Sequence, residues 1–266
     1  MVVLEKPNYI IEGEGQPVFL LNGQFMPIST WEDIIEDLKR WYKVIALEFP
    51  NQGSSPTYGS YVSMMDYCKY FLEFIDYIGI PADQLIVFGL SFGANIIRML
   101  SLKMKVKFKA IIIGGVNPIY RKAASVYSEY REIYSLIESR RIEKFAREYY
   151  SSVFSDTFIG ERDGIIEVSA RKLRENYEHR PEALIALIKA SESFYPNMHG
   201  LEERYPCDTY VIAGTQDHYV DHSLAKHYAE IINAGFYEID AGHAFTVENN
   251  FEFMSILHGI LQKYDN

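Results

Sequence analysis

The segment that most constrains the fold of this chain is residues 89–93, with the sequence GLSFG. The apolar run before it predicts a buried strand, and the residues after it predict a helix. A serine on so sharp a turn takes a strained backbone conformation, and the residues two before and two after it crowd together. Gly89 and Gly93 meet the resulting need for very small residues. We therefore expect the turn to hold the Ser91 hydroxyl above one edge of a sheet.

A serine hydroxyl becomes a good nucleophile when a histidine takes its proton and a carboxylate orients that histidine. Both follow Ser91, in the order acid and then histidine. The apolar run 209–213 predicts a strand, and Asp217 lies on the loop past its end. A second predicted strand, 236–239, leads into a loop that ends at His243. Because the carboxyl ends of parallel strands meet at one edge of a sheet, we expect these three side chains to come together.

Three other residues could be considered for the acid. Asp221 begins the next predicted helix and fits better as its N-cap. Asp240 stands only three residues before His243, at the end of the same strand, and is poorly placed to reach the ring. Asn117 carries an amide, which cannot stabilise an imidazolium as a carboxylate can. The sequence therefore favours Asp217.

These motifs, with two further segments, resemble those of the α/β-hydrolase superfamily, in the small single-domain kind that carries a helical lid. Residues 18–24, VFLLNGQ, resemble the strand and loop that supply one oxyanion-binding amide in that family. The resemblance places this amide on Gln24 or, as the alternative, on Phe25. The other oxyanion amide would be that of Phe92, at the start of the helix after the serine. Residues 48–55, EFPNQGSS, resemble the family's turn after the next strand.

The alternation of strand and helix patterns predicts an α/β fold with a mainly parallel, doubly wound sheet, of the α/β-hydrolase type by resemblance. Strands are expected at residues 9–12, 18–21, 44–48, 85–88, 110–114, 209–213 and 236–239. Helices are expected at residues 31–40, 63–78, 92–103, 223–233 and 248–263. The chain between the fifth and sixth of these strands is far longer than one crossover requires. We therefore expect a core of residues 1–117 and 201–266 with a helical lid inserted at 118–200.

The expected lid shows helical patterns at 123–150 and 165–193, broken near 156–164, and it is rich in aromatic residues. We expect most of these aromatic side chains to form the lid's own core and its contact with the main domain. A minority should line the substrate pocket. A largely uncharged aromatic roof favours a substrate with a sizeable apolar or planar part.

Composition narrows the possible partners. A net charge of −10 argues against nucleic acid or an anionic membrane surface. The N-terminal residues lack the pattern of a signal peptide, and no apolar run approaches the length of a membrane span. We expect a cytoplasmic protein that acts on a small molecule. The sequence does not indicate its oligomeric state.

The remaining histidines do not form a pattern typical of a metal site. His218 directly follows Asp217, and adjacent loop residues rarely face each other. His222 and His227 are five residues apart on a predicted helix, a spacing that does not bring both side chains to one face. We expect neither a metal nor an organic cofactor.

The sequence predicts a serine hydrolase that cleaves an ester, lactone or thioester of a medium-sized apolar or aromatic molecule. In this interpretation His243 accepts the proton of Ser91, Asp217 orients the ring, and the amides of Phe92 and Gln24 bind the oxyanion. Water then releases the acyl group. Two alternatives stay open. The same residues could serve a carbon–carbon bond hydrolase or an acyltransferase, or they could belong to a small-molecule receptor with little turnover.

Overall fold

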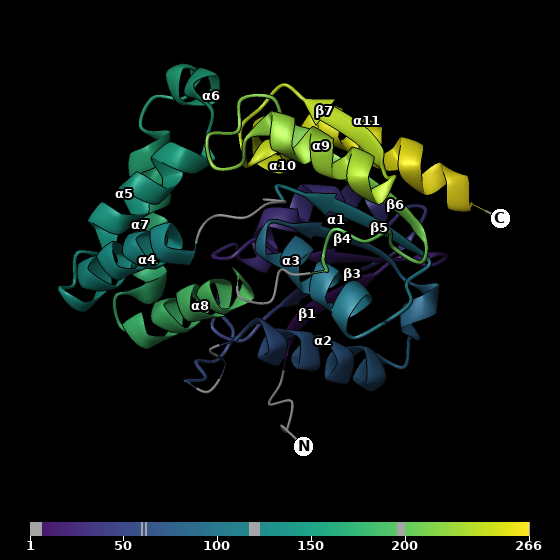
Figure 1. Ribbon diagram of the computed structural model, residues 1–266, viewed down its shortest axis with the longest axis horizontal. Coiled ribbons are helices and arrows are strands. Elements are labelled where there is room, and N and C mark those ends of the chain that lie inside the picture. Colours follow the sequence, from purple (N-terminus) through teal and green to yellow (C-terminus); the bar gives the residue numbers. More distant parts are fainter. Residues whose placement is uncertain (1–6, 60, 62, 117–122, 196–199, 266) are drawn as a thin grey trace.

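A computed structural model describes residues 7–59, 61, 63–116, 123–195 and 200–265, with the backbone alone for residues 123–129. Within these residues a seven-stranded sheet has the order β1-β3-β2-β4-β5-β6-β7 (Figure 1). The strands are β1 (Asn8–Glu12), β2 (Pro17–Leu21), β3 (Lys43–Glu48), β4 (Ile86–Leu90), β5 (Ala110–Gly114), β6 (Asp208–Gly214) and β7 (Gly235–Ile239). All neighbouring strands are parallel except β1, which is antiparallel to β3. The predicted α/β fold with a mainly parallel sheet is confirmed.

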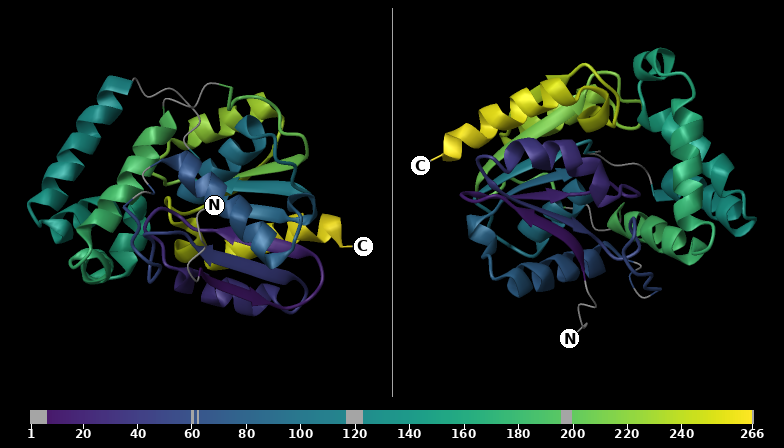
Figure 2. Two further views of the ribbon diagram at one scale, coloured as in Figure 1. Left: turned by 90° about the horizontal axis from the view of Figure 1, so that it is seen from below. Right: turned by 180° about the vertical axis from the view of Figure 1, so that it is seen from behind.

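Helices cover both faces of the sheet, as a doubly wound fold requires (Figure 2). One face packs against α2 (Met64–Ile78), α3 (Phe92–Arg98) and α9 (His222–Ile232). The other face packs against α1 (Glu32–Leu38) and α11 (Asn250–Leu261). Successive residues of a strand point to opposite faces, so Phe19 lies in the first of these two cores and Leu20 in the second.

The boundaries of α2 follow from local chemistry. The Ser63 side chain accepts a hydrogen bond from the amide of Asp66, and the Asp66 carboxylate accepts one from the amide of Ser63. These two reciprocal bonds form a capping box, which fixes the start of the helix. The helix ends at Gly79, which has a φ of 69° and nothing within 4 Å of the position where a Cβ would stand.

A helical insertion, residues 123–194, lies between β5 and β6 and stands to one side of the sheet (Figure 1). It contains α4 (Ala123–Glu138), α5 (Ile142–Val153), α6 (Asp156–Glu161), α7 (Ile165–Tyr177) and α8 (Pro181–Phe194). The predicted helical stretch 123–150 is thus two helices, because the chain turns at Arg140 with a φ of 59°. The stretch 165–193 is also two helices. Pro181 starts the second of them at a position where its missing N–H costs no hydrogen bond.

Two predicted helices outside the insertion also differ in detail. The helix after the elbow is α-helical only to Arg98 and continues as a π-helical turn, Met99–Lys103. The predicted helix 248–263 corresponds to α11 and a 3-10 turn, Gln262–Tyr264, and a separate short helix, α10 (Phe245–Glu248), precedes it. The side chain of Asn249 caps α11 by accepting from the amide of Glu252. A cap of this kind ends one helix and starts another within a single apolar pattern.

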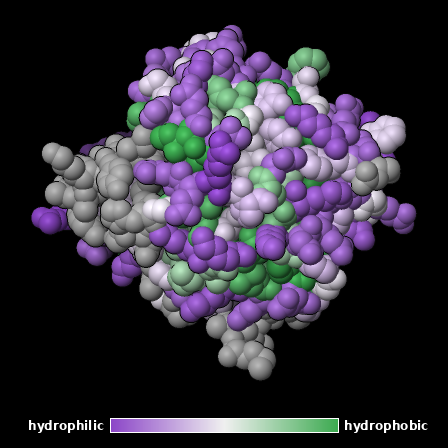
Figure 3. Space-filling view, turned by 45° about the vertical axis from the view of Figure 1, so that its right-hand side comes forward, coloured by the Kyte–Doolittle hydropathy of each residue, from purple (hydrophilic) through white to green (hydrophobic). Residues whose placement is uncertain are grey.

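Hydrophilic residues predominate on the face drawn in Figure 3, where apolar residues form separate patches. Within the described part of the chain, no helix combines the length and the apolar character that crossing a bilayer demands.

Candidate active site

Ser91 lies between the end of β4 and the start of α3, with a φ of 52° and a ψ of −103°. Its amide donates to the carbonyl of Gly114 on the neighbouring strand, with a nitrogen–oxygen distance of 2.8 Å. A Cβ at Gly89 would lie 2.6 Å from the amide nitrogen of Ala94, and a Cβ at Gly93 would lie 2.5 Å from the carbonyl oxygen of Leu21. The predicted need for glycine at both positions is confirmed.

Asp217 and His243 come together at the carboxyl edge of the sheet. Oδ2 of Asp217 lies 2.7 Å from Nδ1 of His243, and the two side chains are 3% and 5% exposed. Oδ1 of Asp217 accepts the backbone N–H groups of Tyr219 and Val220 at 2.7 and 2.8 Å. Because a carboxylate beside Nδ1 favours the proton on that nitrogen, the opposite nitrogen of the ring is left to accept one.

The other two carboxylates that could orient His243, Asp221 and Asp240, have different partners. Asp221 caps α9 by accepting from the amides of Ser223 and Leu224. The hydroxyl of Ser223 and these amides lower the pKa of the Asp221 carboxyl. Asp240 accepts from the side chains of Thr215 and Gln216. Asn117 lies outside the described residues.

Gly115 connects the serine turn to the histidine. It follows Gly114, whose carbonyl accepts the amide of Ser91, and a Cβ at Gly115 would lie 2.8 Å from Cε1 of His243. Ser91 and His243 line one cavity of about 760 Å³, together with aromatic side chains of α5. The structure therefore places Ser91 and His243 on one cavity and Asp217 against the ring of His243.

The loop after β2 is tied directly to the serine turn. The carbonyl of Asn22 accepts the amide of Gly93 at 3.0 Å, so this loop lies against the first turn of α3. The side chain of Asn22 is buried, accepts from the indole N–H of Trp31 at 2.6 Å and donates to the carbonyl of Met26 at 3.0 Å. These bonds fix the loop on both sides of Gly23 and Gln24.

Gln52 sets the direction of the Gln24 amide, a role that sequence reasoning missed. Its Nε2 donates to the carbonyls of Gly23 and Gln24 at 2.8 and 3.1 Å, and its Oε1 accepts the amide of Phe49. The Gly23 carbonyl and the Gln24 N–H belong to one planar trans peptide group and point in opposite directions. Holding the carbonyl therefore turns the N–H of Gln24 the other way. In the sequence, the feature that could have indicated this role is the position of Gln52 in the turn 48–55.

The helical insertion contacts the loop that carries His243. The carbonyl of Val153, the last residue of α5, accepts the amides of His243 and Ala244 at 2.9 and 3.3 Å. Oε2 of Glu248 accepts the amides of Gly242 and Ser155 at 2.9 and 3.1 Å. The sequence carries no signal for these contacts, since main-chain groups far apart along the chain make most of them.

Within the described residues, no group of three or more His, Cys, Asp or Glu side chains could hold a metal ion. His218 approaches Asp156 at 3.5 Å, and His222 lies 2.7 Å from Glu238. Each of these histidines thus faces a single carboxylate.

The serine turn and the histidine loop lie within a part of the sequence, residues 18–255, that matches the alpha/beta hydrolase family. The chain belongs to this family. A curated relative from Acinetobacter baylyi is 26% identical to this chain over 115 residues. This relative is (E)-2-((N-methylformamido)methylene)succinate hydrolase. That match covers 43% of this chain and 42% of the relative, so the chain matches less than half of the relative's length.

Solved structures share the fold over nearly the whole chain. A thermophilic esterase from Thermogutta terrifontis superposes with a TM-score of 0.80 at 19% identity, covering 98% of this chain and 94% of the esterase. The enol-lactonase of Burkholderia xenovorans gives a TM-score of 0.79 at 16% identity, with 96% of each chain covered. At these low identities the similarity shows that the fold is shared, and it shows nothing beyond the fold.

Proposed function

We propose that this α/β hydrolase cleaves an ester-type bond through an acyl intermediate on Ser91. The observation that carries the proposal is the buried Asp217–His243 pair, whose facing atoms are 2.7 Å apart. Its histidine lines the same cavity as the strained serine. A histidine oriented by a carboxylate is the base that such a serine requires. The named esterase and enol-lactonase share only the fold, so the assignment depends on this geometry.

In the proposed reaction, the unprotonated ring nitrogen of His243 takes the proton of Ser91 as its oxygen attacks the substrate carbonyl carbon. The carbonyl π-electrons move to oxygen, and Asp217 stabilises the imidazolium that forms. When the tetrahedral intermediate collapses, the bond to the leaving group breaks and His243 gives it the proton. Water, activated in turn by His243, attacks the acyl-enzyme, releases the acid and restores Ser91.

The amides of Phe92 and Gln24 are proposed to bind the oxyanion. Phe92 is the first residue of α3, where backbone N–H groups have no partner within the helix and the helix dipole favours negative charge. The hydrogen bonds of Gln52 to the two neighbouring carbonyls support the same role for Gln24. Phe25, the alternative, has its ring packed against Phe145 and Tyr149.

The helical insertion is proposed to act as the lid over this site, with residues 118–200 as the lid and 1–117 and 201–266 as the catalytic core. The cavity of about 760 Å³ that contains Ser91 is lined from the insertion side by the aromatic residues Tyr149, Tyr150 and Phe154, and also by charged residues of α7, Lys172 and Glu175. The aromatic part of this lining supports a medium-sized substrate with an apolar or planar part.

The test is turnover by the wild-type protein and by Ser91→Ala across a panel of esters, thioesters and lactones. We expect sustained hydrolysis by the wild type and a loss of roughly three to six orders of magnitude in Ser91→Ala. Equal rates for the two proteins would contradict the proposal. Turnover that needs an added alcohol or amine acceptor would assign an acyltransferase instead, and stoichiometric binding without turnover would assign a receptor.

A further inference from the structure

A second cavity, of about 250 Å³, adjoins the one that contains Ser91. Among the described residues, the two cavities have Phe25 and Tyr149 in common. The rings of these two residues meet edge to face, with centroids 5.1 Å apart, and we call them the aromatic pair. Because both side chains belong to both walls, the aromatic pair lies at the boundary between the two cavities.

The helix α5 explains why Tyr149 lies at this boundary. Phe145 and Ser152 line the second cavity and are seven residues, or about two turns, apart, so they share one face of the helix. Tyr150 and Val153 line the cavity that contains Ser91 from a neighbouring face. At about 100° of rotation per residue, Tyr149 stands between these two faces. One side of its ring is therefore turned to each cavity.

The aromatic pair is held by both parts of the protein. Phe25 is 5% exposed, and its ring also meets that of Phe145 edge to face, at a centroid distance of 5.7 Å. The side chain of the preceding residue, Gln24, donates to the carbonyl of Leu187 on α8 at 2.9 Å. The loop that carries Phe25 is thus attached to the helical insertion. A ring packed in this way changes place only when its neighbours move with it.

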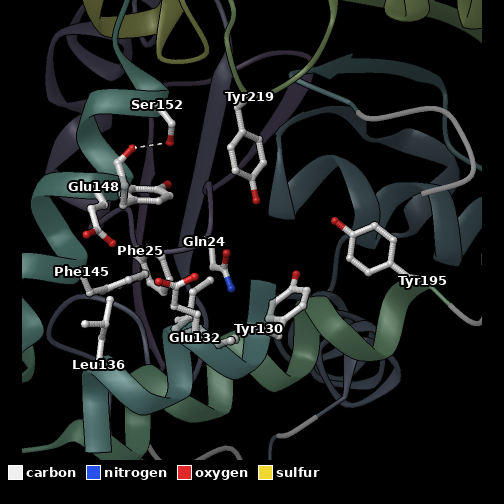
Figure 4. A pocket seen from close by; sticks show the side chains of 13 residues that line it. Gln24, Phe25, Tyr130, Glu132, Leu136, Phe145, Glu148, Ser152, Tyr195 and Tyr219 are labelled. Carbon is white, nitrogen blue, oxygen red and sulfur yellow. Dashed lines mark hydrogen bonds between the residues drawn. The ribbon is translucent and has the colours of Figure 1, made fainter. Parts of the chain in front are cut away.

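The second cavity suits an uncharged chain. Phe25, Phe145 and Leu136 lie together on one side of it (Figure 4). The charged side chains in its described lining are those of Glu132 and Glu148, both exposed. These two carboxylates repel negative charge on a ligand, whereas the apolar side favours an alkyl or aryl chain that loses its contact with water.

We infer that the aromatic pair sets the length of the substrate chain that this hydrolase accepts. A chain that extends from Ser91 along its cavity ends against the pair. The second cavity receives a longer alkyl or aryl chain once one of the two rings is removed. Phe25 and Tyr149 are thus specificity-determining residues, and they favour a medium-length, uncharged substrate. This inference rests on the proposed serine hydrolysis.

The test compares p-nitrophenyl esters with straight acyl chains from acetyl through hexanoyl to lauroyl, each below its critical micelle concentration. A second series varies the alcohol chain of acetate esters in the same way, because the chain can be carried on either side of the scissile bond. For the wild type, we expect kcat/KM to fall roughly tenfold or more beyond the medium chains of one series. In that series, Tyr149→Ala should raise the ratio of kcat/KM for the long ester to that for the medium ester. The rise should be roughly ten- to hundredfold, because the added methylene groups become buried.

Two variants are the matched controls. Tyr149→Phe keeps the ring of the pair and removes only the hydroxyl. Tyr134→Ala makes the same truncation at another partly exposed tyrosine of the insertion, which lines neither cavity. Both controls should keep the wild-type ratio. Phe25→Ala removes the other ring from the side of the core and should raise the ratio as Tyr149→Ala does, and circular dichroism shows whether each variant is folded.

A ratio that stays at the wild-type value in the folded Tyr149→Ala and Phe25→Ala variants, with hydrolysis of short esters intact, would overturn the inference. The proposed function would still stand. An equal rise in Tyr134→Ala, or a wild type that hydrolyses long and medium esters equally well in both series, would also overturn it. Absence of hydrolysis of every ester by the wild type would contradict the proposed function, and the inference with it.

Discussion

The backbone amide of His243 donates a hydrogen bond to the carbonyl of Val153, with 2.9 Å between nitrogen and oxygen. Val153 ends α5 of the insertion, so the loop that presents the histidine is held by an element that lines the cavity. Glu248 bridges the same junction by accepting the amides of Gly242 and Ser155. The position of the insertion and the orientation of the proposed base are therefore set by one group of contacts.

Glu248→Ala should lower kcat by roughly tenfold or more, because it removes the acceptor that holds Gly242, the residue before His243. The lost hydrogen bonds to a charged group should also reduce the free energy of unfolding by about 1.5–3 kcal/mol. Steady-state kinetics and denaturant unfolding measure the two effects. Glu252→Ala is the control, because this carboxylate lies on α11 and its partners are Asp240 and Asn249. An unchanged kcat in Glu248→Ala would show that these contacts do not position the histidine.

Gly115→Ala should nearly abolish activity, because the new methyl group would lie 2.8 Å from Cε1 of His243 and must displace the ring. Gly79→Ala provides a matched control. The two glycines have φ values of 59° and 69°, so both substitutions strain the backbone by roughly 1–2 kcal/mol, but the Gly79 position is open. Both variants should therefore lose stability, and only Gly115→Ala should lose kcat. A parallel decrease in the two variants would contradict this account of Gly115.

Gln52→Glu should lower kcat by roughly ten- to a hundredfold with a smaller effect on KM. The new oxygen would face the carbonyls of Gly23 and Gln24, which now accept from Nε2, and would turn the proposed oxyanion amide away. Gln16→Glu is the control. The Nε2 of Gln16 also donates to two carbonyls, those of Pro17 and Gln84, but away from the cavity with Ser91. Equal kcat values for both variants would argue against a role for Gln52.

Asp217→Asn should lower kcat by up to about four orders of magnitude with little change in melting temperature, because the amide permits the wrong tautomer of His243. Asp221→Asn and Asp240→Asn remove the same charge from a helix cap and from a pair of side-chain contacts. These two variants should keep most of their activity. A large loss in either of them, with Asp217→Asn active, would assign the acid elsewhere.

The parts of the site that the sequence predicts are those governed by local rules. The elbow around Ser91 is one of these, because the glycines on either side are needed for steric reasons within five residues of chain. The approach of Asp217 to His243 follows from strand order, since β6 and β7 are parallel neighbours. Their positions could therefore be expected once two strands were recognised.

Other features depend on contacts that leave no pattern in the sequence. The bonds of Val153 to the histidine loop join main-chain groups, which every residue has. The break at Arg140 interrupts a continuous helical pattern through a left-handed backbone conformation that arginine rarely adopts. The ring of Phe25 meets that of Tyr149 across a long distance in sequence, and aromatic spacing alone indicates only that such residues are buried.

The most direct test of the central claim is the intact mass of the protein after brief exposure to an activated ester whose acyl group is released slowly. We predict that the wild type gains the mass of one acyl group and that peptide mapping places it on Ser91. Ser91→Ala should gain none, while circular dichroism shows that it is folded. An adduct of equal yield on Ser91→Ala, or catalytic hydrolysis by the wild type with no acyl group on Ser91 under rapid quench, would contradict the account.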